Sequence, residues 1–414
     1  NAVDFVASGT LSSGQTVALK ADGTVTAVAS DAGGPEVGSS VTFLSNTTNS
    51  TGATFDSNLN KVVIAYRDQG NGNYGTAIVG TVSGTSISFG SPVVFESAQT
   101  SSIASTFDSN LNKVVIAYRD NTNSSYGTAI VGTVSGTSIS FGSPTIYETA
   151  NAAYTTATFD SNSNKVVIAY SDYGNSGFGT AVVGTVSGTS ISFGSPVVFE
   201  SAESLFSSAA FDSNLNKVVI AYRDAPNSSY GTAIVGTVSG TSISFGTAIV
   251  FNSAQSSSFS TTFDSSSNKI VICYEDSGNS SYGTSIVGTV SGTSISFGTA
   301  VVFSGNSAVN YVVSSFDSNL NKVVISYQDI TDNSYGKIVV GAVSGTTISF
   351  GQPLLFNSGT SNYICSAFDS SSNKVITGYN NGTSSNGEAV VIQTASSNSA
   401  DFIGITAEAI SDTA

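Results

Sequence analysis

Short apolar runs separated by polar turns fill almost the whole chain. In one representative stretch the runs cover residues 105–108, 113–120, 126–134 and 137–148, and each is rich in Val, Ile, Thr, Phe or Tyr. Ser, Asn, Gly or Asp bound every run, as expected for strands joined by turns. Apolar residues nowhere recur at the i, i+3, i+4, i+7 spacing of an amphipathic helix. The pattern therefore predicts groups of four short strands and almost no helix.

This group of four runs is a repeat. Phe-Asp-Ser occurs seven times, five of the six intervals are 52 residues and one is 53, and the copies begin at Phe55, Phe107, Phe159, Phe211, Phe263, Phe316 and Phe368. The second run of each copy, such as residues 62–66, is apolar on both faces, which indicates burial on both sides. A β-solenoid is the main alternative, but its coils are usually shorter and lack a hairpin at every join. We predict an all-β, seven-bladed β-propeller of four-stranded antiparallel blades.

The seventh copy is incomplete. It lacks the Thr-Ser-Ile-Ser-Phe-Gly segment that precedes the fourth-strand residues in the other copies, whereas residues 38–45, ahead of the first copy, align with residues 90–97. The sequence therefore predicts that an N-terminal strand near Val41 to Leu44 completes the last blade. It would pair with the strand near Glu388 to Thr394 and close the ring without an exposed edge.

Two extensions flank the predicted propeller, which we place at residues 36–396. Residues 1–35 contain a hairpin pattern with Asp22-Gly23 as its turn, followed by a short linker. Residues 397–414 contain one apolar run, 402–406, and an Ala/Ser/Asp-rich tail. Ring closure brings both ends out at the same blade, so we expect the extensions to share one small β appendage that packs together or anchors to a partner.

The charge and composition exclude several functions. The chain has 27 acidic and 12 basic residues, a net charge of −15 and no histidine, so the commonest general acid/base and metal ligand is missing. Seven of the basic residues follow the repeated Asp by five positions, in the order Asp56 to Lys61, where they form either a cross-hairpin pair or an Asx-capped turn. The remaining five, Lys20, Arg67, Arg119, Arg223 and Lys337, are too few for a phosphate-tracking stripe. We expect no nucleic-acid partner and, without an apolar run of about 18 residues, no membrane insertion.

The two cysteines are expected to be inert. Cys273 and Cys365 replace alanines of other copies and fall in blades that are not neighbours. We predict two buried thiols and no disulfide.

Aromatic residues recur in the crossovers between blades. Tyr154, Phe206, Tyr311 and Tyr363 each stand five residues before their Phe-Asp-Ser copy, and Phe259 stands four before. This position is expected near the mouth of the central channel, on the face where the copies vary most. The five side chains are the candidate ligand-binding residues, because aromatics around a polar opening suit sugars or a partner's apolar groups. Alternatively, they pack on one another and plug the opening.

The same face is expected to be acidic. Its loops of the type Asp-x-x-Asn-x-x-Tyr-Gly offer oxygen ligands for Ca²⁺, but no copy has an established calcium-loop spacing and Asx-turns explain the residues equally well. Paired carboxylates for glycoside hydrolysis are also conceivable. Because the acids recur from blade to blade without one distinct copy, we expect no enzyme, no catalytic residue, no metal site and no cofactor.

The repeat strings Asn-Lys-Val-Val-Ile-Ala-Tyr-Arg-Asp and Gly-Thr-Val-Ser-Gly-Thr-Ser-Ile-Ser-Phe-Gly resemble β-propeller repeats in structural proteins of tailed bacteriophages, especially marine ones. The flanks beginning at Phe5 and Phe402 are similar to the terminal modules of such proteins. The resemblance implies a virion or extracellular structural protein, a capsid-decoration, fibre or tail-associated propeller. Its termini would bind other virion proteins, and its acidic face would point outward and meet the host, whose surface glycans are further possible partners. The alternative function is a secreted or cell-surface bacterial glycan-binding propeller.

Overall fold

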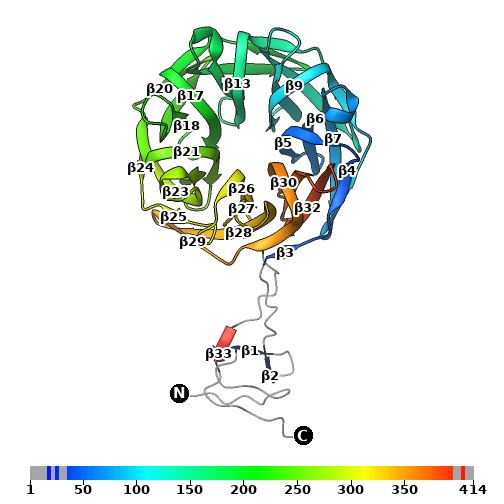
Figure 1. Ribbon diagram of the computed structural model, residues 1–414, viewed down its shortest axis with the longest axis vertical. Helices are drawn as coiled ribbons and strands as arrows, with labels where there is room; N and C mark the ends of the chain where they lie inside the picture. Colours follow the sequence, from blue (N-terminus) through cyan, green and yellow to red (C-terminus); the bar gives the residue numbers. More distant parts are fainter. Residues whose placement is uncertain (1–15, 20–23, 28–34, 395–401, 406–414) are drawn as a thin grey trace. The chain divides into compact units, whose positions relative to one another are not determined.

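The computed structural model describes residues 16–19, 24–27, 35–394 and 402–405. The chain divides into two compact units, one of residues 37–392 and one formed by residues 1–36 and 393–414. The first is a ring of antiparallel strand groups (Figure 1). The β-propeller that the repeats predict is confirmed. We number its repeating units 1 to 7 after the seven Phe-Asp-Ser copies.

Unit 2 shows how each group is built. Its innermost strand is the second half of β9 (Val93–Asp108), which pairs with β10 (Lys113–Asp120), and β10 pairs with β11 (Tyr126–Ser135). The outermost position is filled by β12 (Ser138–Phe141) and by the first residues of β13 (Thr145–Asp160), both paired with β11. β13 then continues as the innermost strand of unit 3. A single long strand, β13, thus links unit 2 to unit 3.

The other units repeat this order with small variations. The same strand pairings recur from copy to copy along residues 35–394. The remaining propeller strands are β3 (Glu36–Val37), β4 (Val41–Leu44), β5 (Thr48–Asp56), β6 (Lys61–Asp68), β7 (Tyr74–Ser83), β8 (Ser86–Phe89), β14 (Lys165–Asp172), β15 (Phe178–Ser187), β16 (Ser190–Phe193), β17 (Val197–Asp212), β18 (Lys217–Asp224), β19 (Tyr230–Ser239), β20 (Ser242–Phe245), β21 (Ile249–Asp264), β22 (Lys269–Asp276), β23 (Tyr282–Ser291), β24 (Ser294–Phe297), β25 (Val301–Val302), β26 (Val309–Asp317), β27 (Lys322–Asp329), β28 (Tyr335–Ser344), β29 (Thr347–Phe350), β30 (Leu354–Asp369), β31 (Lys374–Asn381) and β32 (Asn386–Gln393). Three single 3₁₀ turns follow the second strands of units 1, 3 and 5: η1 (Gln69–Asn71), η2 (Tyr173–Asn175) and η3 (Ser277–Asn279).

The ring closes as predicted. β32, the third strand of unit 7, pairs with β4 in a register that places Glu388 opposite Thr42 and Ala389 opposite Val41. β3 continues the outer position beside β32. The Glu388 carboxylate also links the two closing segments, because Ser40 Oγ donates to its Oε2 at 2.7 Å. Strands from both ends of the propeller therefore complete one unit.

Strands from both termini also share the second, small sheet. β1 (Thr16–Leu19) pairs antiparallel with β2 (Val25–Ala27) on one side and with β33 (Phe402–Ile405) on the other. This confirms the shared β appendage. The predicted Asp22-Gly23 turn and the C-terminal tail after residue 405 lie outside the described residues.

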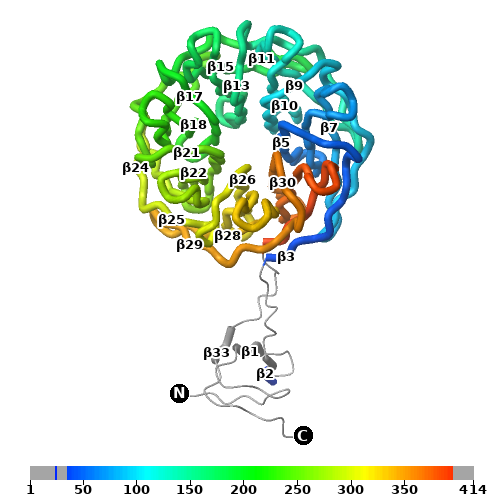
Figure 2. Tube along the Cα trace, viewed as in Figure 1, coloured from blue at the N-terminus to red at the C-terminus, as the bar shows by residue number. Residues whose placement is uncertain are grey.

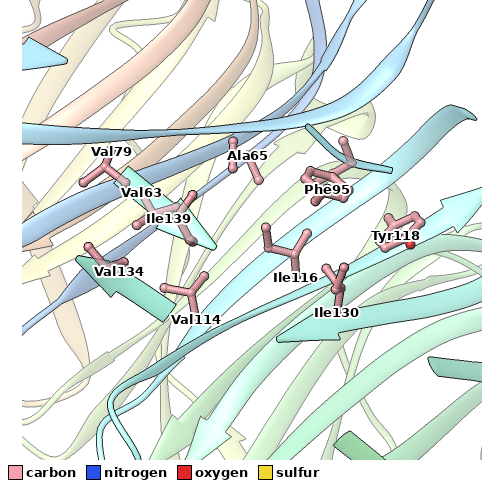
Figure 3. Packing of buried hydrophobic residues seen from close by; sticks show 12 residues of the cluster. Val63, Ala65, Val79, Phe95, Val114, Ile116, Tyr118, Ile130, Val134 and Ile139 are labelled. Atoms are coloured by element: carbon pink, nitrogen blue, oxygen red, sulfur yellow. The ribbon is translucent and has the colours of Figure 1, made fainter. Parts of the chain in front are cut away.

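The hydrophobic core lies between neighbouring units. Val63 and Ala65 of β6 form one buried cluster with Val114 and Ile116 of β10 (Figure 3). Apolar residues on both faces of the second strands are therefore needed, because each strand packs against two neighbours. The second strand of each unit also buries a tyrosine almost completely. These tyrosines are Tyr66, Tyr118, Tyr170, Tyr222, Tyr274, Tyr327 and Tyr379. Both cysteines are buried and free, as predicted.

The outer strand differs from its predicted form. The single strand expected over residues 137–148 is interrupted between Phe141 and Thr145, where Pro144 cannot donate to a strand partner. Gly142 lies in this break, and a Cβ there would stand 1.9 Å from the Thr189 carbonyl oxygen of the next unit. The break therefore lets neighbouring units approach backbone to backbone.

The first turn of unit 1 decides between the two expectations for the repeated Asp and Lys. Asp56 Oδ1 accepts from the backbone N–H groups of Asn58 and Leu59 at 2.9 and 3.0 Å. Lys61 Nζ donates instead to Thr81 Oγ1 at 2.8 Å. Asp56 therefore forms an Asx-capped turn, while Lys61 bridges to the third strand.

Candidate functional site

A bulge in the innermost strand positions the candidate aromatics. The pairing of β13 with β14 shifts between Ala153 and Thr156, and Tyr154 within this shift has a left-handed φ of 51°. The same position is left-handed in every unit, at Ser50, Ser102, Tyr154, Phe206, Ser258, Tyr311 and Tyr363. A bulge turns a side chain away from the regular alternation of a strand. Four of the five predicted aromatics occupy this position, on strands that surround the centre of the ring (Figure 2).

These four side chains pack in pairs across neighbouring units. The ring centroids of Tyr154 and Phe206 are 4.7 Å apart, and those of Tyr311 and Tyr363 are 5.2 Å apart. Arg223 lies over the Phe206 ring, with its Cζ 4.5 Å from the ring centroid. The mutual packing expected as the alternative to ligand contact is therefore present, and all four rings remain partly exposed.

Phe259 lies apart from the others. It follows the left-handed residue Ser258 and is only 9% exposed, in a core cluster with Phe251 and Tyr274. One residue along an extended strand changes the face to which a side chain points. The spacing of four rather than five residues from the Phe-Asp-Ser copy was the signal for this difference.

A cleft opens beside Tyr154, between units 2 and 3. Its volume is about 360 Å³, and its lining residues are Ser102, Arg119, Asn151, Ala153, Tyr154 and Tyr173. The sequence analysis singled out only Tyr154 among these. Tyr173 carried a signal that could have been read, because the other units have Gln, Asn, Ala, Ser, Ile or Gly at this position of the second-to-third turn.

Arg119 is held rigidly at the cleft. Its Nε donates to Ser101 Oγ and to Asn121 Oδ1, both at 2.8 Å, and its Nη1 donates to Asn151 Oδ1 at 3.2 Å. These acceptors are all neutral, and they come from the innermost strand, the following turn and the part of β13 that pairs with β11. The guanidinium is thus fixed in position and keeps N–H groups that these bonds do not use.

Tyr173 also lines the cleft. It begins η2, where the Asp172 carboxylate accepts from the N–H groups of Gly174 and Asn175 and fixes the turn. Its hydroxyl donates to Glu203 Oε1 at 3.2 Å. Burial, followed by the nearby Glu203 charge, raises the pKa of Tyr173 to about 12, so the phenol stays protonated at neutral pH.

Most carboxylates of this face have structural tasks. Asp68, Asp120 and Asp172 accept from backbone N–H groups of the turns that follow them. Glu96, Glu148 and Glu200 accept from the buried tyrosine hydroxyls of the next unit at 2.9 Å each. Within the described residues no group of three or more His, Cys, Asp or Glu side chains could hold a metal ion.

A second cavity lies on the innermost strands beside the repeated Phe-Asp pairs. Its volume is about 420 Å³, and its lining combines small residues such as Thr54 and Ala210 with the aromatic rings of Phe55, Phe107, Phe159, Phe211 and Phe263. It offers no charged group. It therefore lacks the directed polar groups that distinguish the cleft between units 2 and 3.

Comparison with known proteins finds a similar fold among solved structures. No protein-family model and no curated protein sequence matches the chain. The lectin BP39L from Burkholderia pseudomallei is similar in structure, with a TM-score of 0.63, 11% identity, and coverage of 84% of this chain and 96% of that one. The SapL1 lectin, solved in complex with alpha methyl fucoside, matches with a TM-score of 0.43 and 14% identity over 75% of this chain and 97% of that one. The likeness to BP39L supports the fold of the chain. In the part of the chain that the structure describes, no helix has the length and apolar character of a membrane span.

Proposed function

We propose that this protein binds carbohydrate, and that the cleft between units 2 and 3 is a binding site. The observation that carries the proposal is the lining of the cleft, which brings Tyr154, Tyr173, Arg119 and Asn151 together around about 360 Å³. Aromatic rings suit the apolar faces of sugar rings, and fixed polar groups select hydroxyl positions. The cleft supplies both kinds of contact.

The cleft is also rigid. Tyr154 is held by the left-handed bulge and by the Phe206 ring, while Arg119 is held by three hydrogen bonds. Groups that are already ordered lose little conformational entropy when a ligand binds. A weak, shallow contact with a sugar can therefore still give a useful affinity.

The lectin likeness and the cleft support glycan binding over a purely structural virion role. BP39L, the structure of similar fold, is described as a lectin. The virion location, the anchoring through the termini and the absence of enzymatic activity remain predictions that rest on the sequence. A mass-spectrometric inventory of purified source particles tests the location separately from the binding.

A glycan array probed with the full chain tests the function. The wild-type protein should bind a defined set of glycans, and Tyr154→Ala should weaken that binding roughly two- to tenfold, as expected for the loss of one aromatic contact of about 0.5–1.5 kcal/mol. Tyr363→Ala is the matched control, because it removes a ring at the same bulge position, with the same kind of packing partner, away from the cleft. No glycan binding by the wild type, or equal losses in both variants, would contradict the proposal.

A further inference from the structure

Three arginines occupy equivalent positions in different units. Arg67, Arg119 and Arg223 each stand next to last in the second strand of their unit, opposite Asn49, Ser101 and Leu205 of the innermost strand. This end of the strand leads into the second-to-third turn, where the cleft lies. The other four units have Ser171, Glu275, Gln328 and Asn380 at this position.

None of these arginines has a carboxylate partner among the described residues. The ion pairs recorded there join Lys337 to Asp329 and Asp332. Arg119 donates to neutral oxygens alone, and Arg67 Nη2 donates at 2.8 Å to the Asn49 amide when that amide turns its oxygen toward the guanidinium. In a chain with 27 acidic and 12 basic residues, chance favours a carboxylate beside each arginine, so arginines without one are unexpected.

The arrangement also costs stability. Burial lowers the pKa of Arg119; Tyr154 and Tyr173 act in the opposite direction, and the like charge of Arg67 lowers it further. The Nε atoms of Arg67 and Arg223 are buried and have no hydrogen-bond partner within the described residues. Partly buried cations that repel one another and lack a counter-charge are unfavourable in the absence of an anion. Positions that sacrifice stability in this way are typical of binding sites.

We propose that the glycan recognised at this cleft carries an anionic group, a carboxylate or a sulfate, and that Arg119 contacts it. The inference rests on the proposed carbohydrate binding and adds the class of sugar. The guanidinium presents planar N–H donors that fit the oxygens of either anion, and Arg67 in the preceding unit adds a favourable field. Tyr154 and Tyr173 would then contact the sugar ring beside the anionic group.

The net charge of −15 gives this recognition a salt dependence of two opposing parts. Repulsion between the acidic chain and an anionic glycan acts over long distances and is screened beyond about 8 Å at 0.15 M salt. The contact with the arginine is short-ranged and weakens only at higher salt. Binding should therefore be strongest at intermediate ionic strength, whereas a neutral sugar would show no such maximum.

The test compares glycans that differ in charge, using the full chain at 0.15 M salt. The array should contain uronate- or sialate-bearing, sulfated and uncharged versions of otherwise similar oligosaccharides. The wild type should bind the charged glycans more tightly than the uncharged ones. Whichever charged glycan, carboxylate-bearing or sulfated, binds more tightly identifies the anion. Arg119→Gln should weaken this binding roughly ten- to hundredfold, the effect of losing a hydrogen bond to a charged group.

Lys113→Gln is the matched control. Lys113 lies in the same strand β10, at its opposite end, and donates to Thr133 Oγ1, so its replacement changes the net charge equally. Its binding should change less than about twofold. Equal losses in both variants, or a wild type that prefers uncharged glycans, would overturn the anionic ligand, the second result leaving carbohydrate binding intact. A wild type that binds no glycan would overturn both proposals.

Discussion

The buried tyrosines of the second strands allow one substitution to be compared at equivalent positions. The Tyr118 hydroxyl donates to Glu96 Oε2 at 2.9 Å, across the boundary between units 1 and 2. Tyr66 occupies the same position in unit 1, but the closing strand β4 has Leu44 where the other strand has Glu96. Within the described residues the Tyr66 hydroxyl is buried and has no hydrogen-bond partner. Replacing each tyrosine by phenylalanine should therefore have opposite effects on stability.

The magnitudes follow from the hydrogen bond in one case and from its absence in the other. A hydrogen bond to a charged group contributes about 1.5–3 kcal/mol, and the partly exposed Glu96 recovers some of this from water. Tyr118→Phe should therefore lower the free energy of unfolding by about 1–2 kcal/mol. Burying an unpaired hydroxyl costs about 1–3 kcal/mol, so Tyr66→Phe should raise it by about 1 kcal/mol.

Guanidinium denaturation followed by circular dichroism measures this difference, provided that the slope of each transition is unchanged. Tyr327→Phe is a second test, because the Tyr327 hydroxyl is also buried without a partner in the described chain. It should behave like Tyr66→Phe. If Tyr66→Phe destabilises the protein as much as Tyr118→Phe does, the reasoning from hydrogen bonding is wrong.

Two further predictions concern charge and close packing. Burial raises the pKa of Glu148. Its contribution to the free energy of unfolding is therefore present below the ordinary carboxyl pKa and is lost as the pH rises through the raised value. Glu148→Gln should then stabilise the fold at pH 7 and have little effect at pH 4. Burial also raises the pKa of Glu388, but hydrogen bonds from neighbouring hydroxyl and amide groups outweigh it, and the net effect lowers the pKa. Glu388→Gln should therefore destabilise the fold at pH 7 and destabilise it less on acidification. Denaturation midpoints measured at pH 7 and pH 4 should show opposite signs for the Glu148 and Glu388 variants. Gly136→Ala, at a φ of 60° with open space around it, should lower the free energy of unfolding by about 1–2 kcal/mol. Gly142→Ala should lower it further, because the new Cβ would meet the Thr189 carbonyl oxygen. Similar denaturation midpoints for the two variants would refute this.

The ring could be predicted from the sequence because its information is periodic. The equal spacing of the Phe-Asp-Ser copies indicated the repeating unit, and the frame of residues 38–45 showed that the first strand completes the last unit. Both inferences depend on the alignment of copies alone. The interruption at Pro144 was present in the sequence as well, but a short apolar run on each side of it made one strand the simpler interpretation.

The cleft could not be predicted in the same way, because neighbouring units build it jointly. Arg119 of unit 2 and Tyr173 of unit 3 are 54 residues apart, and both line the cleft only when the two units pack together. No glycine in the sequence indicates the left-handed conformation at Tyr154, since serine, tyrosine and phenylalanine all occupy this bulge position. Only tertiary packing around the bulge can hold such residues at a positive φ.

The closure by β4 and β32 also determines how the ring responds to a pulling force. The N–H of Gly38 donates to the carbonyl of Val391 at 2.8 Å, so the first and last residues of the propeller lie side by side at one end of an antiparallel pair. Tension applied through these two ends loads the hydrogen bonds one after another, beginning at Gly38, rather than all together. A propeller pulled apart through its two ends would therefore open by peeling at the closing strand, while the units that bear the cleft stay folded.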